Sequence, residues 1–168
     1  MQDLRANIVD SNTLQRIKID RLEFWADSVA TFKDPNFNVK ASPRVVFLGE
    51  AGIDACGLRC EYATLLCREI FSAEASLCEG TGNNKLPIFS VQAIQSRLLF
   101  LAGKMIAYTM VHQDIGVPCL SPAFHAYMVT GSIEEASPFC SMNDIADYDV
   151  KQWIQQVEKN LQSADKTD

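Results

Sequence analysis

The chain has 168 residues, 48% of them apolar, and this size and composition predict a single domain, residues 1–168, with a buried core. A formal net charge of −6 without a lysine or arginine cluster makes nucleic acid an unexpected partner. The first residues do not have the basic-then-apolar order of a signal peptide, and no apolar run approaches the roughly 20 residues that span a bilayer. We therefore expect no membrane partner and a cytoplasmic or nuclear location.

The first 50 residues predict a strand, a helix and a second strand. Residues 17–21, IKIDR, alternate apolar and polar side chains as a half-buried strand does. The next segment, LEFWADSVATFKD, has helical spacing of its apolar positions, which are Leu22, Trp25, Val29 and Phe32. Residues 34–43 contain two prolines and predict a loop, after which RVVFLGE predicts a buried strand.

Residues 57–71 predict a helix with two apolar faces, and Asp54 is placed to cap its first turn. One face consists of Leu58, Tyr62, Leu65 and Leu66. The other consists of Cys56, Cys60, Ala63, Cys67 and Ile70. A helix that is apolar on two sides is expected to pack against neighbours on both.

The second half of the chain predicts a loop and three helices. Residues 79–86 indicate an exposed loop, and 91–112 predict one long helix. A short helix is bounded by Ser121, Pro122 and Gly131, which suit its start and end. A last helix has one apolar face, and residues 162–168 form a polar tail. That face is Val150, Trp153, Ile154, Val157 and Leu161. The expected fold class is α+β, mostly helical, with a few short strands.

The six cysteines allow three readings: metal ligands, a nucleophile, or small buried residues. They are Cys56, Cys60, Cys67, Cys78, Cys119 and Cys140. Structural zinc sites usually pair ligands as CxxC, and no such pair occurs, so neither zinc nor any other metal is expected. Free cysteine is among the most buried residue types, which favours packing.

A nucleophilic cysteine needs a neighbour that favours the thiolate, usually an imidazole or a helix N-terminus. Cys56 lies near the predicted helix start. Arg59 or Arg68 could polarise Cys60, but adjacent residues on a helix point to different sides. The possible imidazole partners, His112 and His125, lie on other predicted helices, and no motif links them to a thiol. No catalytic residue is therefore assigned.

The turn GEAGIDACG is not a phosphate-binding loop. It contains neither GxGxxG nor a terminal GK[ST], and Glu50 and Asp54 would repel a phosphate. Its glycines instead suit a tight turn between a strand and a helix, with the carboxylates bonding backbone amides. No cofactor is expected.

The order of strand, GE-x-G-x-D turn and helix resembles the N-terminal lobe of HECT-type ubiquitin-protein ligases. The signature of the large subdomain of that lobe is similar to VVFLGEAGIDACGLRCEYATLLCREIF. A later helix of the lobe is similar to FLAGKMIAYTMVHQ, and the segments after that helix are similar to LSPAFHAYMVTG and DIADYD. The similarity covers about residues 15–160, and its details are closer to the divergent, cell-cycle-associated ligase-like subgroup. On this resemblance the structural motif residues are Glu50, Gly52, Asp54, Gly57, Arg59 and Glu61.

The chain departs from the family pattern at two positions and in length. Cys56 replaces one of two usual glycines, and Cys60 replaces the arginine that usually precedes Glu61, so an interaction of that turn is missing or replaced. The family's subdomain for docking the conjugating enzyme and its thioester lobe are not recognisable, and no cysteine here has the Thr-Cys context of the family's active cysteine. The resemblance implies part of a ligase that does not transfer ubiquitin by itself. The alternative is a non-catalytic binding or regulatory module, with ubiquitin-pathway proteins or a full-length ligase as partners.

Overall fold

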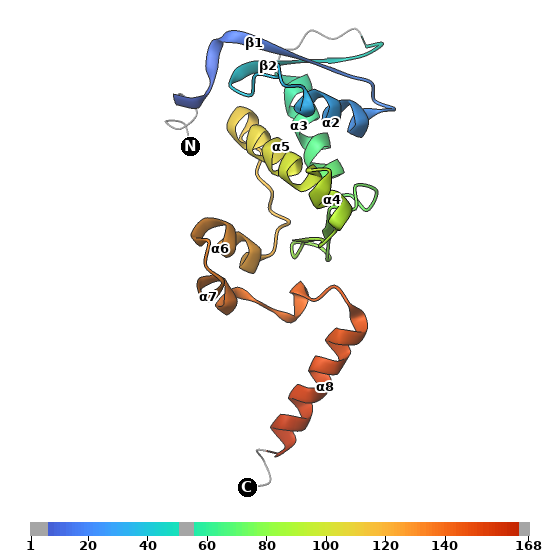
Figure 1. Cartoon of the computed structure of the whole chain (residues 1–168), viewed down its shortest axis with the longest axis vertical. Helices are drawn as coiled ribbons and strands as arrows, with labels where there is room; N and C mark the ends of the chain where they lie inside the picture. The colour runs from blue at the N-terminus through green and yellow to red at the C-terminus, as the bar shows by residue number, and fades with distance from the viewer. Residues whose placement is uncertain (1–6, 51–55, 165–168) are drawn as a thin grey trace. The chain divides into compact units, whose positions relative to one another are not determined.

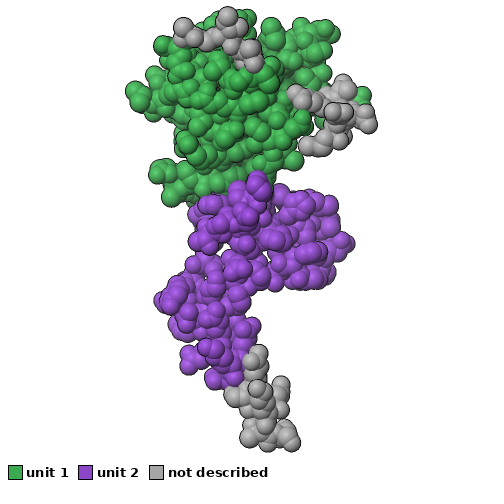
Figure 2. Space-filling model, turned by 180° about the vertical axis from the view of Figure 1, so that it is seen from behind, with its two compact units in different colours: residues 1–77, 89–117 green, residues 78–88, 118–168 purple. Residues whose placement is uncertain are grey.

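The computed structural model describes residues 7–50 and 56–164 and shows an α+β fold, mostly helical with short strands (Figure 1), as the sequence predicts. The backbone contacts divide the chain into two compact units (Figure 2). Unit 1 comprises residues 1–77 and 89–117, and unit 2 comprises 78–88 and 118–168. The two units are described separately, and the single domain over 1–168 stays a prediction.

Unit 1 begins with a parallel pair of strands. Strand β1 (Asp10–Ile19) pairs with β2 (Ala41–Phe47), and helix α2 (Phe24–Lys33) connects them. Residues Ile17 and Ile19 lie opposite Val45 and Phe47, and all four side chains are at most 1% exposed. The strand predicted over 17–21 therefore starts earlier and ends two residues sooner, so that Asp20 and Arg21 lie beyond it.

Helix α3 (Gly57–Ile70) packs against β2, α2 and α5 (Leu98–Gln113), as expected of a helix with two apolar faces. Buried residues come from both predicted faces: Tyr62 and Leu66 from one, Ala63 and Ile70 from the other. The thiols of Cys60 and Cys67 belong to the second face, contact α5 and are half-buried.

The buried face of α2 differs from the prediction. Leu22 is 92% exposed and precedes the helix, where its N–H donates to Asp20. Within the helix, Phe24, Ser28 and Phe32 are spaced four residues apart and are buried, whereas the predicted residues Trp25 and Val29 are half-buried. Of the four predicted residues, only Phe32 is fully buried. Tyr62 donates a hydrogen bond to the buried hydroxyl of Ser28, which satisfies this polar residue in the core.

The long helix predicted over 91–112 is broken. It consists of α4 (Val91–Gln95) and α5, separated by Ser96 and Arg97, and Arg97 has a left-handed backbone with φ of 57°. The apolar residues Val91 and Ile94 are more than half exposed, whereas Leu101 and Met105 are buried. The turn at Arg97 changes the direction of the chain, so that α5 packs along the core while α4 buries only Ala93.

Unit 2 contains a small hairpin where a loop was predicted. Strands β3 (Cys78–Glu79) and β4 (Leu86–Pro87) are antiparallel. The backbone of Lys85 accepts from Ser121 and donates to Cys119, which fixes the segment that leads into α6 (Pro122–Thr130).

The predicted ends of α6 are confirmed. The buried hydroxyl of Ser121 accepts from the N–H of Ala123, Pro122 is the first helical residue, and Gly131 follows the helix with φ of 69°. The remaining elements are α7 (Ile133–Ala136), the 3₁₀ turns η1 (Ser137–Phe139) and η2 (Met142–Asp144), and α8 (Tyr148–Ala164).

Helix α8 carries the predicted apolar face. Trp153, Val157 and Leu161 are each more than half exposed, and Ile154 is half-buried. The predicted apolar surface on this helix is therefore present. Neither α8 nor any other helix within 7–50 and 56–164 combines the length and apolar character needed to cross a bilayer.

Candidate functional site

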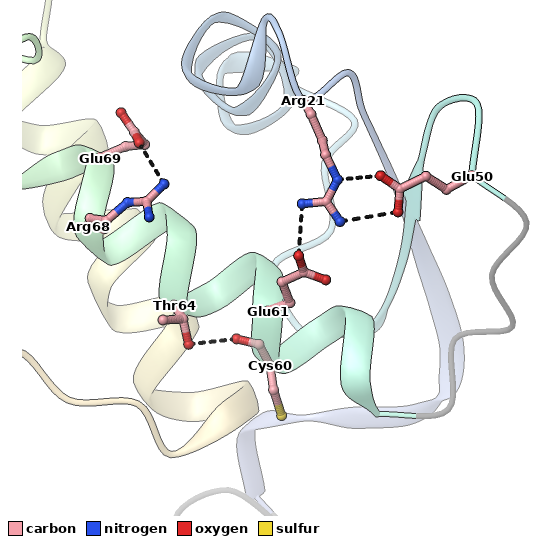
Figure 3. A network of polar contacts seen from close by, with 7 residues as sticks. All are labelled: Arg21, Glu50, Cys60, Glu61, Thr64, Arg68 and Glu69. Atoms are coloured by element: carbon pink, nitrogen blue, oxygen red, sulfur yellow. Dashed lines mark hydrogen bonds and ion pairs between the residues drawn. The ribbon is translucent and has the colours of Figure 1, made fainter.

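Three segments that are separate in the sequence meet at the guanidinium of Arg21 (Figure 3). Arg21 follows β1, Glu50 follows β2, and Glu61 lies in the second turn of α3. Arg21 donates from Nε to Oε1 of Glu50 and from Nη2 to Oε2, the latter over 3.1 Å. Its Nη1 lies 2.8 Å from Oε1 of Glu61. We call these three residues the Arg21 network.

The guanidinium of Arg21 also lies over the aromatic ring of Phe47. The Cζ atom of Arg21 lies 3.9 Å from the ring centroid, within the range of a cation–π contact. Since Phe47 ends β2 and is buried, the charged group is held against the edge of the core. A planar guanidinium can contact an aromatic face and two carboxylates at once, which an ammonium group cannot do in this geometry.

The electrostatics of the network follow from these contacts. The hydrogen bonds from Arg21 lower the pKa of Glu50 below its usual range. The bonds to Glu50, and then those to Glu61, raise the pKa of Arg21 above its usual range. All three side chains remain about 40% exposed, so solvent screens the network and its main effect is to fix the orientation of the three segments.

Of the six predicted motif residues, two belong to this network, two are described outside it, and two lie outside the described residues. Glu50 and Glu61 bind Arg21, Gly57 begins α3, and half-buried Arg59 is not part of the network. Gly52 and Asp54, including the predicted cap by Asp54, lie outside the described residues.

Sequence reasoning missed Arg21 as a member of the site. The arginine that usually precedes Glu61 in the family pattern is Cys60 here, and Glu61 pairs with Arg21 instead. The available signal was the charged pair Asp20 and Arg21 directly after a strand, but a local pattern does not indicate which distant carboxylates an arginine will reach.

The thiols of Cys56 and Cys60 lie beside each other at the start of α3. Their Sγ atoms are 3.8 Å apart, and Cys60 also donates to Oε1 of Gln113 at the end of α5, over 3.4 Å. Cys56 is exposed and has a left-handed backbone with φ of 73°. Cys56 directly precedes α3, and a residue at this position need not have a helical backbone.

The surroundings of Cys67 and Cys78 disfavour the thiolate form. Partial burial raises the pKa of Cys67, whose Sγ lies 3.4 Å from Oγ1 of Thr109. Burial also raises the pKa of Cys78, and nearby Cys119 adds to this effect. Within 7–50 and 56–164, no three histidine, cysteine or acidic side chains are grouped so as to hold a metal ion.

His112 is a core residue in unit 1. It is 2% exposed, its ring centroid lies 4.2 Å from that of Tyr108, and its Nε2 lies 2.9 Å from the carbonyl oxygen of Val39. His125 is exposed on α6 in unit 2. The thiol contacts described above involve neither imidazole.

Unit 1 also has a shallow hollow of about 230 Å³ between the end of α2 and the start of α5. Three cations line it, Lys33, Arg97 and Lys104, together with the rings of Phe32 and Phe100. Lys104 donates from Nζ to the carbonyl oxygen of Phe32 over 3.0 Å, so one cation is held in place. The surface combines positive charge and aromatic rings, a composition suited to an acidic partner.

Comparison with known proteins finds similarity to ubiquitin ligases, as the sequence motif predicts. No family model matches the chain. Over 143 residues, 83% of the chain, it is 29% identical to the G2/M phase-specific E3 ubiquitin-protein ligases of Macaca fascicularis and Homo sapiens. It is also 29% identical over 144 residues to the probable E3 ubiquitin-protein ligase mug30 of Schizosaccharomyces pombe.

The chain is similar to E3 ubiquitin-protein ligases over most of its length. The predicted resemblance to ubiquitin ligases, and to cell-cycle-associated ones in particular, is thereby confirmed. The chain spans about a fifth of the length of these E3 ligases, 19% for the two G2/M phase-specific proteins.

Proposed function

We propose that this chain forms the large subdomain of a HECT-type N-terminal lobe and serves ubiquitin ligation as a scaffold that does not itself carry ubiquitin. The observation that carries the proposal is the Arg21 network, in which Arg21 joins two residues of the signature, Glu50 and Glu61. In this role Glu50 and Glu61 orient the strand, turn and helix, and the neighbouring parts of a complete ligase supply conjugating-enzyme docking and the thioester cysteine.

The state of the thiols supports a non-catalytic role. An acceptor of ubiquitin must attack as a thiolate from an accessible position. Burial raises the pKa of Cys67 and Cys78, and the S–H of Cys60 donates a hydrogen bond to Gln113. These environments make Cys60, Cys67 and Cys78 poor acceptors of ubiquitin, and the charging assay below covers the exposed thiols of Cys56 and Cys140.

The test is a charging assay. The chain is incubated with ubiquitin, activating enzyme and a panel of conjugating enzymes, and the products are separated on gels with and without reductant. We expect no thiol-sensitive ubiquitin adduct on this chain under conditions that charge a complete HECT-type ligase. An adduct that disappears in a single Cys→Ser variant would overturn the proposal.

A binding or regulatory module is the second candidate, favoured by the exposed apolar face of α8 and by the basic hollow of unit 1. Its partners would be ubiquitin-pathway proteins or a full-length ligase. Adding the chain in excess to a reaction of a full-length relative separates the two candidates. A regulatory module should change the rate of substrate ubiquitination, and replacing Trp153 on α8 or Arg97 in the hollow should abolish this change. A scaffold that binds none of the added proteins should leave the rate unchanged.

A further inference from the structure

The two thiols at the start of α3 are close enough to react with each other. Their Sγ atoms are 3.8 Å apart, and a disulfide requires about 2.05 Å, so the sulfurs must approach by less than 2 Å. The N–H of Cys60 donates to the carbonyl oxygen of Cys56 over 3.1 Å, which places the residues one helical turn apart. One turn separates Cα atoms by about 6 Å, within the range that disulfides span.

The backbone of Cys56 permits the remaining adjustment. Within a regular helix, Cβ atoms four residues apart are about 5–6 Å apart, which is wider than a disulfide prefers. Cys56 precedes the helix and has φ of 73°, a conformation that is unfavourable for a residue with a side chain. Because Cys56 lies before the first helical residue, rotation about its Cα–C bond moves its Cβ relative to Cys60 without disturbing the helix.

We propose that Cys56 and Cys60 form a reversible disulfide when a peroxide is present. One thiolate attacks a peroxide oxygen, the O–O bond breaks, and a sulfenic acid and one water form. The second thiolate attacks the sulfenic sulfur, the S–S bond forms, and the hydroxyl leaves as a second water. Two thiols and one hydrogen peroxide thus give one disulfide and two waters, and a thiol reductant reverses the change. The proposal does not depend on the proposed role in ubiquitin ligation.

The surroundings favour this pair over other thiols. Cys56 is exposed, so a peroxide can reach it, and the resolving thiol lies next to it. Cys67 on the same helix lies two turns further along, bonds Thr109, and is half-buried. Cys78 and Cys119, in unit 2, are the competing pair, but burial raises the pKa of Cys78 and makes it a poorer nucleophile.

Oxidation would alter a contact between helices. The S–H of Cys60 donates to Gln113, which joins the start of α3 to the end of α5. A disulfide sulfur has no proton to donate, so this bond is lost, and the first turn of α3 becomes tied to the preceding residue instead. Glu61 of the Arg21 network follows Cys60 directly, which places the change beside the candidate site.

Tryptic digestion provides a sharp test because Arg59 lies between the two cysteines. Cleavage after Arg44, Arg59 and Arg68 separates VVFLGEAGIDACGLR from CEYATLLCR. The whole chain is treated with hydrogen peroxide, free thiols are blocked, and the peptides are analysed by mass spectrometry. We expect these two peptides to be linked, the link to disappear with reductant, and the intact monomer to be lighter by two hydrogen atoms before digestion.

Variants assign the link to individual thiols. Because Cys67 lies in the same peptide as Cys60, the link should be lost in Cys56→Ser and Cys60→Ser but retained in Cys67→Ser. Circular dichroism confirms that each variant is folded. Three results would overturn the proposal: a link that depends on Cys67, links only between separate molecules, or peroxide products confined to sulfinic and sulfonic acids on unlinked cysteines.

Discussion

At the scale of single residues, Arg21 is the centre of the candidate site because of the shape of its guanidinium. It contacts two carboxylates and an aromatic ring: Phe47 ends β2, Glu50 follows this strand, and Glu61 lies in α3. Without its charge, the two carboxylates that it contacts, Glu50 and Glu61, would lose this shared cation. The residue therefore replaces a repulsion with an attraction between β2 and α3.

Replacing Arg21 tests this role. In Arg21→Lys the charge remains but the paired geometry is lost, and in Arg21→Gln the charge is lost as well. We expect both variants to lower the midpoint of thermal unfolding, Arg21→Gln by more. Arg16→Gln, which removes an exposed arginine outside the network, is the control. Equal effects of Arg21→Gln and Arg16→Gln would show that the network does not orient the motif.

The pKa of Glu50 predicts how the network responds to acid. The pKa of Glu50 in the folded state lies below the ordinary value of 4.5, so the unfolded state binds the proton more readily. The contribution of ionised Glu50 to stability is therefore present above pH 4.5. It is lost as the pH falls through the folded-state pKa. The difference in thermal midpoint between the unmutated protein and Glu50→Gln should thus be largest at neutral pH and shrink below pH 4.5. The exposed residue Glu74 supplies a control, Glu74→Gln, whose midpoint should follow that of the unmutated protein. A gap that stays constant with pH would contradict the assignment.

At the scale of elements, two glycines in helical regions have opposite roles. Gly103 lies inside α5, exposed, and a Cβ there would meet nothing within 4 Å. Gly131 follows α6 with φ of 69°, and a Cβ there would also meet nothing within 4 Å. Space is available at both sites, so only the backbone conformation distinguishes them.

The same substitution should therefore change stability in opposite directions. We expect Gly103→Ala to raise the free energy of unfolding by roughly 0.5–1 kcal/mol, because alanine loses less backbone entropy in a helix. We expect Gly131→Ala to lower it by about 1 kcal/mol, because a side chain disfavours the left-handed region. Urea unfolding followed by circular dichroism measures both. A change of the same sign at both glycines would refute the assigned backbone roles.

At the scale of the whole molecule, the chain consists of two compact units, and unit 2 ends in a helix with an exposed apolar face. Contiguous apolar surface of this kind usually marks an interaction site. The chain spans about a fifth of the length of the E3 ubiquitin-protein ligases to which it is similar.

If the face of α8 is accessible in solution, isolated chains should associate weakly through it. Light scattering should show an apparent mass that rises with concentration, and Val157→Asp combined with Leu161→Asp should remove this rise. Gln152→Asp combined with Gln156→Asp adds the same charge at exposed positions outside the apolar face and should leave it unchanged. A constant monomer mass for the unmutated chain would exclude self-association through α8.

Local signals in the sequence determined much of this protein. The α+β class, the β2 strand, the two-faced helix α3 and the amphipathic α8 follow from hydrophobic periodicity. The ends of α6 follow from Ser121, Pro122 and Gly131, whose preferences depend on the backbone of the same residues. The motif also indicated correctly the relationship to ubiquitin ligases.

Only the tertiary structure decided the features that depend on distant contacts. The break at Arg97 and the buried face of α2 depend on how each helix meets the core, which periodicity over one segment does not contain. The same limit applies to the site: Glu50 and Glu61 were predicted from the motif, but their partner Arg21 is 29 residues from Glu50 and is brought there by the parallel pairing of β1 and β2. Sequence spacing determines which residues share a helix face, whereas packing determines which charges meet.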